Sequence, residues 1–122
     1  MRICILGGCG YVGTVLTDIL LKHKNVIKVI DMQWFGNRLQ NHKDLTVVKK
    51  DIRNITSKDF QSFDTIIHLA NIANDPTVEL QPNLSWDVNV MTMIKVLESA
   101  SKARIKRFGC NSTVGSFAIF AR

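Results

Sequence analysis

A short apolar run at the start of the chain leads directly into three glycines, and this transition constrains the fold more than any other feature. Residues 2–6 are RICIL, and Gly7, Gly10 and Gly13 follow with the spacing G-x-x-G-x-x-G. Glycine suits such a turn because it adopts backbone angles closed to other residues and lets a pyrophosphate approach the main chain closely. The first amides of a following helix favour a bound anion. The pattern predicts a dinucleotide-binding turn, although glycine-rich turns also serve plain strand-to-helix packing.

Apolar residues after this turn recur at intervals of three and four, which predicts a helix with one apolar face that ends between residues 22 and 25. The apolar positions are Val12, Val15, Leu16, Ile19 and Leu20. A second apolar run over residues 26–30 ends at Asp31. Residues 2–31 therefore form one strand–helix–strand unit of about 30 residues, the size that the glycine pattern requires.

The remainder of the chain continues the alternation of strands and helices. We expect strands over 45–49, 65–70 and 107–111, a loop over 34–44, a short helix after Thr56, a long helix over 84–102 and a tail of small residues after Thr113. Nearly continuous apolar strands are typical of a buried parallel sheet. With right-handed crossovers, the chain is predicted to be an α/β protein, a doubly wound parallel sheet with strand order 3-2-1-4-5 in a single domain over residues 1–122.

The net charge of +6, from 16 basic and 10 acidic residues, raises the question of a nucleic-acid partner. One group of cations flanks the strand and turn positions of residues 49–58, and a second lies at a predicted helix carboxyl end, residues 102–107, where cations suit the helix dipole. No aromatic residue lies between the cations of either group. We therefore expect a solvated basic face and no binding of nucleic acid.

Composition also limits the compartment and the cofactor chemistry. No apolar run approaches the roughly 20 residues of a membrane span, and no secretory signal fits a start interrupted by glycines, so no membrane association is expected. Cys4, Cys9 and Cys110 show no C-x-x-C spacing, which indicates neither a disulfide framework nor a metal site and favours the reducing cytoplasm. Cys9 lies near the predicted helix amino terminus, a position expected to lower the pKa of its thiol.

Asp31 stands 18 residues after Gly13, at the end of the second predicted strand. A carboxylate at this place accepts hydrogen bonds from the adenosine ribose hydroxyls and repels a 2′-phosphate. The residue therefore favours NAD over NADP as the cofactor. Its alternative role is that of an ordinary strand-end turn aspartate.

Further motifs follow one another along nearly the whole chain. They are the turn over residues 7–13, Asp31, Asp51-Ile52-Arg53, His68-Leu69-Ala70, Pro82 with Asp87 and Asn89, and Arg107-Phe108 leading to Ser112-Thr113. In this order the set resembles the amino-terminal part of an extended short-chain dehydrogenase/reductase, of the NAD-dependent epimerase/dehydratase family. The resemblance implies a Rossmann fold that is incomplete relative to the family, NAD as the cofactor, and a nucleotide sugar as the substrate of the full-length parent protein.

The resemblance also assigns cofactor contacts to particular residues. The main chain of Tyr11 would meet the pyrophosphate, Asp31 the ribose and Asp51 the adenine amino group. The full set that it implies is Gly7, Gly10, Tyr11, Val12, Gly13, Asp31, Met32, Asp51, Ile52, Leu69, Ala70, Asn71 and Asn89. Structural roles are the alternatives, with Asp51 as a turn aspartate and Asn89 as a helix residue bonded to a neighbouring loop. His68 is interpreted as a packed strand-end histidine, because nothing pairs it with a catalytic partner.

Catalysis in the family uses a Tyr-x-x-x-Lys pair with a serine or threonine hydroxyl. The lysine lowers the pKa of the tyrosine, so that its phenolate takes a proton while hydride passes to the nicotinamide. By resemblance, the hydroxyl maps to Thr113, with Ser112 as its neighbour. The chain departs from the pattern here, because Ser116-Phe117-Ala118 replaces the usual Val-Tyr-Gly, the only tyrosine is Tyr11, and no Tyr-x-x-x-Lys is present before Arg122.

Two hypotheses follow from these observations. In the first, the chain is the NAD-binding portion of a nucleotide-sugar epimerase or dehydratase, catalytically incomplete without the family's carboxyl-terminal substrate domain. In the second, it is a non-catalytic dinucleotide-binding or sensor module of the same superfamily. A Tyr-x-x-x-Lys about 25 residues further along the parent sequence would favour the first. The apolar face of the helix over 84–102 is expected either to form a homodimer contact or to be covered by the rest of the parent protein.

Overall fold

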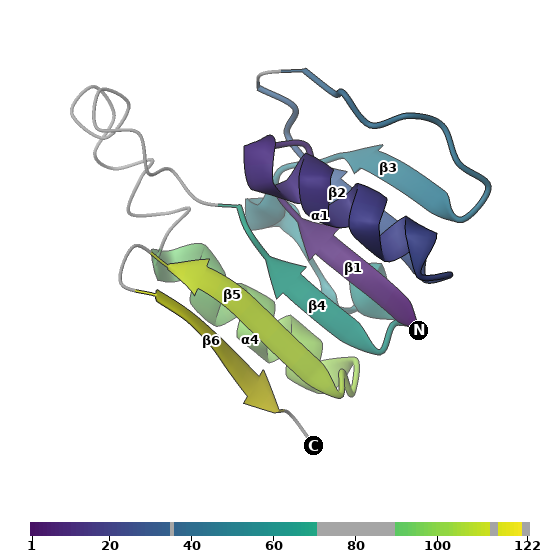
Figure 1. Ribbon diagram of the computed structural model, residues 1–122. Coiled ribbons are helices and arrows are strands. Elements are labelled where there is room, and N and C mark those ends of the chain that lie inside the picture. Colours follow the sequence, from purple (N-terminus) through teal and green to yellow (C-terminus); the bar gives the residue numbers. More distant parts are fainter. Residues whose placement is uncertain (35, 71–89, 113–114, 121–122) are drawn as a thin grey trace.

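The computed structural model describes residues 1–34, 36–70, 90–112 and 115–120 of the chain, with side chains through residue 110 (Figure 1). The strands are β1 (Arg2–Leu6), β2 (Val26–Asp31), β3 (Leu45–Lys49), β4 (Thr65–His68), β5 (Arg107–Ser112) and β6 (Gly115–Phe120). The helices are α1 (Tyr11–Lys22), two 3₁₀ helices, η1 (Ile52–Asn54) and η2 (Ser57–Phe60), and α4 (Thr92–Lys102). The expected start of the long helix, residues 84–89, and Pro82 lie outside the described residues.

The sheet has the strand order β3-β2-β1-β4-β5-β6, which confirms the predicted order 3-2-1-4-5. The first five strands in this order run parallel, and β6 pairs antiparallel with β5. The tail expected after Thr113 thus contains a sixth strand over residues 115–120, which the sequence analysis did not predict. Only its antiparallel pairing with β5 reveals this strand.

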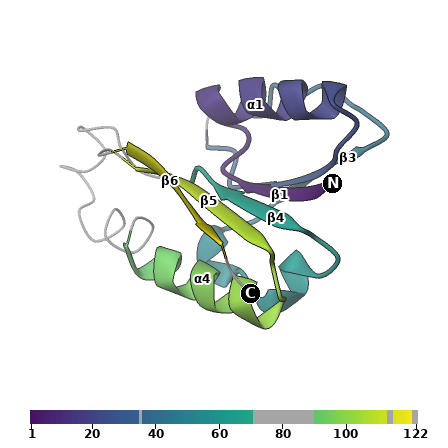
Figure 2. The same ribbon diagram turned by 60° about the horizontal axis from the view of Figure 1, so that its bottom comes forward.

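Parallel register aligns the carboxyl ends of the central strands at one edge of the sheet. Leu6 at the end of β1 pairs with Ile30 of β2 on one side and with His68 of β4 on the other. Figure 2 shows α1 on one face of the sheet and α4 with the short helices on the opposite face. In doubly wound sheets ligands bind beyond these carboxyl ends, so the segments that follow β1, β2 and β4 form the candidate ligand site.

Alternating side chains of the central strands build two cores, one on each face. On the α1 face, Ile5 of β1 and Val29 of β2 are fully buried. On the α4 face, Phe60 of η2, Val96 of α4 and Phe108 of β5 pack together and exclude water. The strands are apolar on both faces for this reason, which agrees with the expectation from their nearly continuous apolar sequence.

The buried face of α1 matches the expected face only in part, because two of its five predicted apolar positions are partly buried and three are exposed. Val12, Val15 and Ile19 are about half exposed, whereas Gly13 and Thr17 are buried. The helix lies so close to the glycine turn that a Cβ on Gly13 would come within 2.5 Å of the Gly8 Cα atom, so small residues form the contact. The prediction from the apolar positions therefore overestimated how much of the helix surface is buried against this sheet.

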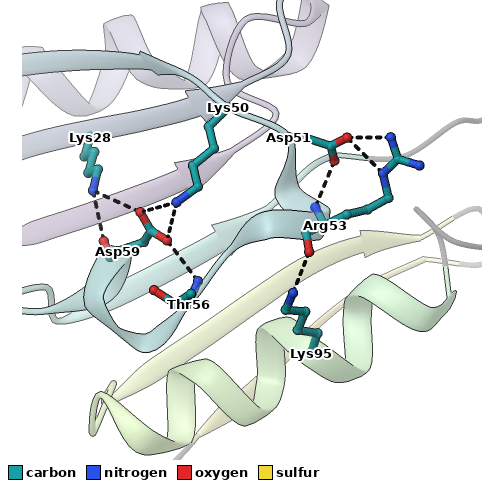
Figure 3. Close-up of polar contacts among 7 residues, drawn as sticks. All are labelled: Lys28, Lys50, Asp51, Arg53, Thr56, Asp59 and Lys95. Carbon is teal, nitrogen blue, oxygen red and sulfur yellow. Dashed lines mark hydrogen bonds and ion pairs between the residues drawn. The ribbon is translucent and has the colours of Figure 1, made fainter.

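A charged cluster fastens η2 to strands β2 and β3 (Figure 3). The Asp59 carboxylate, 14% exposed, accepts hydrogen bonds from the Thr56 amide at 2.9 Å and from Lys50 Nζ at 3.0 Å. Lys28 Nζ donates to the Asp59 carbonyl oxygen at 3.1 Å. Burial by itself raises the pKa of Asp59, but the Thr56 hydrogen bond and the Lys50 charge outweigh it and hold that pKa below its ordinary value.

Replacing Asp59 by asparagine is expected to lower the free energy of unfolding at neutral pH by about 1–3 kcal/mol, because charge-assisted hydrogen bonds are lost at a partly buried site. Since folding depresses the Asp59 pKa, its charge stabilises the protein above the unfolded-state pKa, and this contribution disappears as the pH falls through the folded-state value. Urea titrations at about pH 7 and about pH 3 should show a difference from wild type that shrinks in acid.

The matched control for this variant is Asp18→Asn, at an exposed position of α1, which should stay within about 0.5 kcal/mol of wild type at both pH values. A destabilisation by Asp59→Asn that is equally large in acid would contradict the electrostatic origin assigned to it.

Candidate functional site

The glycine turn, residues 7–13, contains three glycines that the fold itself requires, Gly7, Gly8 and Gly13; a Cβ on Gly8 would lie 2.7 Å from a methyl group of the buried Val29 side chain. Gly7 has φ of +82°, and a Cβ there would lie 2.5 Å from the amide nitrogen of Ala70. A Cβ on Gly13 would meet the Gly8 Cα atom at the same distance. Gly7 thus lets β1 pass close to the chain that leaves β4, and Gly13 lets α1 pack on the turn.

Gly10 differs from these three glycines. Its backbone is extended, with φ of −76°, a conformation open to any residue, and the nearest atom to a Cβ would be the Gly7 carbonyl oxygen at an ordinary 3.6 Å. Neither backbone strain nor packing within the described chain therefore requires glycine here. The position leaves open space directly at the amino terminus of α1.

The amino terminus of α1 has features suited to an anion. No side chain caps it, and its first turn contains no acidic residue. The first amides of a helix have no partner within the helix, and they carry the positive end of its dipole. Tyr11 and Val12, in the first turn, are 89% and 53% exposed. The turn and helix can therefore accept a phosphate group through main-chain N–H groups.

Asp31, at the end of β2, lies beside the glycine turn. Its carboxylate accepts the Cys9 N–H at 3.0 Å through Oδ2 and the Gln33 N–H at 2.6 Å through Oδ1. The Gly7 N–H donates to the Ile30 carbonyl oxygen at 2.8 Å, which joins the turn to the end of β2. These bonds leave each carboxylate oxygen with further acceptor capacity. The structure thus places Asp31 within the same site as the turn, and its contact with a ribose stays a prediction.

Cys9 has a thiol whose pKa is raised, not lowered. Burial and the negative charge of Asp31 raise that pKa to about 11, so the lowering expected from the helix amino terminus was wrong. The side chain is only 9% exposed, and its Sγ atom lies 3.7 Å from Asn37 Oδ1. The amino terminus of the helix does not compensate for the loss of hydration, because a carboxylate lies on the other side of the thiol.

Asn37 is a site residue that the sequence analysis missed. It lies in the loop after β2, where Gly36 has φ of +88°. The Gly36-Asn37 pair is a common turn signal, and its position shortly after Asp31 was the available clue. The loop is folded against the glycine turn, so residues that seemed to have no clean pattern contribute to the site.

Asp51, which follows β3, has the structural role that the sequence analysis gave as the alternative to a contact with adenine. It caps η1 by accepting the Arg53 N–H at 2.9 Å and forms an ion pair with the Arg53 guanidinium (Figure 3). The hydrogen bond from the Arg53 side chain holds the Asp51 pKa below its ordinary value. Lys95 Nζ donates to the Arg53 carbonyl oxygen at 2.6 Å, which ties η1 to α4. A contact of Asp51 with adenine stays a prediction.

The end of β4 meets the glycine turn through its main chain. The Leu69 N–H donates to the Leu6 carbonyl oxygen at 2.7 Å, and Ala70 lies against Gly7. The His68 side chain is buried beside Phe108, which belongs to the core on the α4 face of the sheet, and the two ring centroids are 6.4 Å apart. This packing is the one expected for a strand-end histidine. Burial lowers the pKa of His68 to about 4.

The other predicted positions divide into two groups. Ile52 is a buried core residue of η1 and Met32 is partly buried after β2. Asn71, Asn89 and Thr113 lie outside the described residues. Within residues 1–34, 36–70 and the described part beyond residue 89, there is no group of three metal-ligating side chains, and no helix is long and apolar enough to span a membrane.

The fold and the site together define a doubly wound α/β protein of the nucleotide-binding class, with its glycine turn at the carboxyl end of β1. Residues 3–120 match the model of the NAD dependent epimerase/dehydratase family. The chain belongs to this family, as its motifs indicated.

Three similar proteins illustrate the match. The UDP-glucose 4-epimerase of Streptococcus mutans is 30% identical over 98% of this chain and 38% of its own length. The epimerase Mth375 from Methanothermobacter thermautotrophicus is 28% identical, with a TM-score of 0.83, over 91% of this chain and 34% of that one. The Bordetella bronchiseptica enzyme WbmH in complex with NAD⁺ is 25% identical, with a TM-score of 0.75, over 88% and 37%. The chain therefore spans little more than a third of the length of these proteins.

Proposed function

We propose that this chain is the NAD-binding portion of a nucleotide-sugar epimerase or dehydratase. The observation that carries the proposal is Gly10, an open position at the uncapped amino terminus of α1, between two glycines that the fold requires. A pyrophosphate there would receive main-chain N–H groups without meeting a side chain. In this proposal Asp31, which accepts two main-chain N–H groups beside the same turn, would also accept the ribose hydroxyls.

The relatives support the cofactor and the substrate class in this proposal. The structure of the enzyme WbmH is a complex with NAD⁺, and the S. mutans relative is a UDP-glucose 4-epimerase. When bound, NAD would supply reversible hydride transfer at a sugar carbon. The residues of this chain would bind and orient the dinucleotide. The proposal assigns to the full-length parent a nucleotide-sugar substrate, a cytoplasmic location and a homodimer contact through residues 84–102. The exposed side chains of Met91, directly before α4, and Ile94, within it, are consistent with such a contact.

The second candidate is a non-catalytic dinucleotide-binding or sensor module of the same superfamily. The 122 residues contain no Tyr-x-x-x-Lys, and their one tyrosine, Tyr11, lies in the glycine turn. Both candidates require NAD binding. They differ in whether the parent sequence contains the Tyr-x-x-x-Lys pair. Reading the parent sequence and assaying the parent protein for nucleotide-sugar turnover therefore distinguish them.

Calorimetric titration should show that the chain binds NAD at least about 10-fold more tightly than NADP. The Asp31 carboxylate would face the extra 2′-phosphate of NADP, and like charges in contact disfavour binding strongly. Asp31→Ala should weaken NAD binding and narrow the difference between the two cofactors. Asp18→Ala, at an exposed position of α1, should bind both as wild type does. Equal affinity of wild type for NAD and NADP would reject the role of Asp31, and no NAD binding at all would reject the proposed function.

A further inference from the structure

Cys9 joins two parts of the candidate site that are far apart in the sequence. Its main-chain N–H donates to Asp31 Oδ2 at 3.0 Å, and its Sγ atom lies 3.7 Å from Asn37 Oδ1. One residue of the glycine turn therefore contacts both the carboxylate at the end of β2 and the loop that follows it. A displacement of this residue would change the geometry of both partners.

The Asn37 side chain is oriented by two donors. Its Oδ1 atom faces the Cys9 thiol and also accepts the Leu39 N–H at 2.9 Å. Because both neighbours donate, the carbonyl oxygen of the amide, rather than its NH₂ group, must point toward them. Leu39 packs against the buried cluster on the α1 face of the sheet. The side chain of Asn37 thus connects the core, the loop and the glycine turn.

The thiol is the donor in its contact with Asn37. Burial and the nearby Asp31 charge raise the Cys9 pKa to about 11, so the thiol keeps its proton at neutral pH. A thiolate would repel both the Asp31 carboxylate and the Asn37 oxygen. The protonated thiol instead lets the turn and the loop approach each other.

We propose that Cys9 and Asn37 are positioning residues, which hold Asp31 and the loop over residues 36–39 in the geometry that recognises the adenosine ribose of a dinucleotide. This inference rests on the proposed function. Cys9 fixes the amide that orients Asp31, and Asn37 fixes Cys9 through its thiol. Neither side chain need touch the cofactor, because each acts through the carboxylate of Asp31.

The test compares two ligands that differ only in the adenosine ribose, namely NAD and its analogue with a 2′-deoxyadenosine. Wild type should bind NAD about 10-fold more tightly than the analogue, since a hydrogen bond to a carboxylate is worth about this much. Cys9→Ala and Asn37→Ala should reduce the ratio to about 3-fold or less, because a displaced carboxylate bonds the hydroxyl poorly. Cys9→Ser should keep most of the ratio, since its hydroxyl also donates to Asn37.

Two further variants separate positioning from loss of folding. Asn41→Ala, at an exposed asparagine between β2 and β3, should keep the wild-type ratio of affinities for NAD and its analogue. The double variant Cys9→Ala/Asn37→Ala should lose no more of the ratio than either single variant, because the two residues act through one contact. A variant that unfolds in part weakens both ligands by the same factor and leaves their ratio unchanged. If Cys9→Ala does not fold, Asn37→Ala, which changes an exposed residue, decides the outcome.

The outcomes distinguish this inference from the proposed function. If wild type binds NAD and discriminates against the analogue, but Asn37→Ala and Cys9→Ala discriminate equally well, the positioning role is overturned and NAD binding stands. If wild type binds neither ligand, the proposed function fails together with the inference. A reduced ratio in both alanine variants, restored in Cys9→Ser, supports the inference.

Discussion

Gly10→Val is expected to abolish NAD binding while the protein stays folded. The valine side chain would fill the open space at the amino terminus of α1, where the pyrophosphate is proposed to meet the main chain. Loss of two or three charge-assisted hydrogen bonds to phosphate would weaken binding by about 100-fold or more. Because Gly10 has an extended backbone with room for a Cβ, the melting temperature should fall by only a few degrees. Calorimetry with NAD and thermal unfolding of the apo protein measure the two effects.

Gly7→Ala and Gly13→Ala are the contrasting variants. Each places a Cβ 2.5 Å from a main-chain atom, and at Gly7 the positive φ adds backbone strain. We expect each to lower the free energy of unfolding by about 3 kcal/mol, with NAD binding lost as a consequence of misfolding. If Gly10→Val bound NAD as tightly as wild type, the open position would not be the phosphate site. If it unfolded like Gly7→Ala, the distinction between the glycines would be wrong.

The parts of the fold that sequence predicted well depend on strong local patterns. β3 has the predicted bounds, and β2 extends the predicted run by one residue to Asp31. The strand order follows from alternating strands and helices once crossovers are right-handed, because few arrangements remain. The glycine turn was located for a similar reason, since its three glycines carry a requirement that few other sequences meet.

The parts that were missed depend on neighbours distant in the chain. The exposed face of α1 is apolar in sequence, and only the close approach at Gly13 shows which face is buried. The pKa of Cys9 depends on Asp31, which no local pattern connects with it. Asn37 gains its place only when the loop after β2 folds back on the turn. Sequence periodicity describes an element and its own faces, whereas these features arise between elements.

The 122-residue polypeptide, although expected to bind NAD, is not expected to interconvert any nucleotide sugar. Proton abstraction needs a positioned base, and general acid–base catalysis typically contributes about 10²- to 10⁴-fold to the rate. The chain contains no Tyr-x-x-x-Lys, and its one tyrosine belongs to the first turn of α1, where the pyrophosphate is proposed to bind. A threonine hydroxyl such as that of Thr113 is a hydrogen-bonding partner rather than a base at neutral pH.

Incubation of the purified chain with NAD and UDP-glucose or UDP-galactose tests this expectation. Neither interconverted sugar nor bound NADH should accumulate above a control without protein, whereas NAD alone should still bind in calorimetry. The two measurements separate the cofactor site, which the described residues build, from a proton-transfer site, for which this sequence has no tyrosine–lysine pair. Enzymes that hold both reactants in place gain a further large part of their rate from this positioning. The chain corresponds to 36–38% of the length of the relatives, so we expect it to position a sugar substrate only in part. Turnover that disappears in Thr113→Ala would show instead that this short chain carries a complete catalytic site, with Thr113 as a member of it.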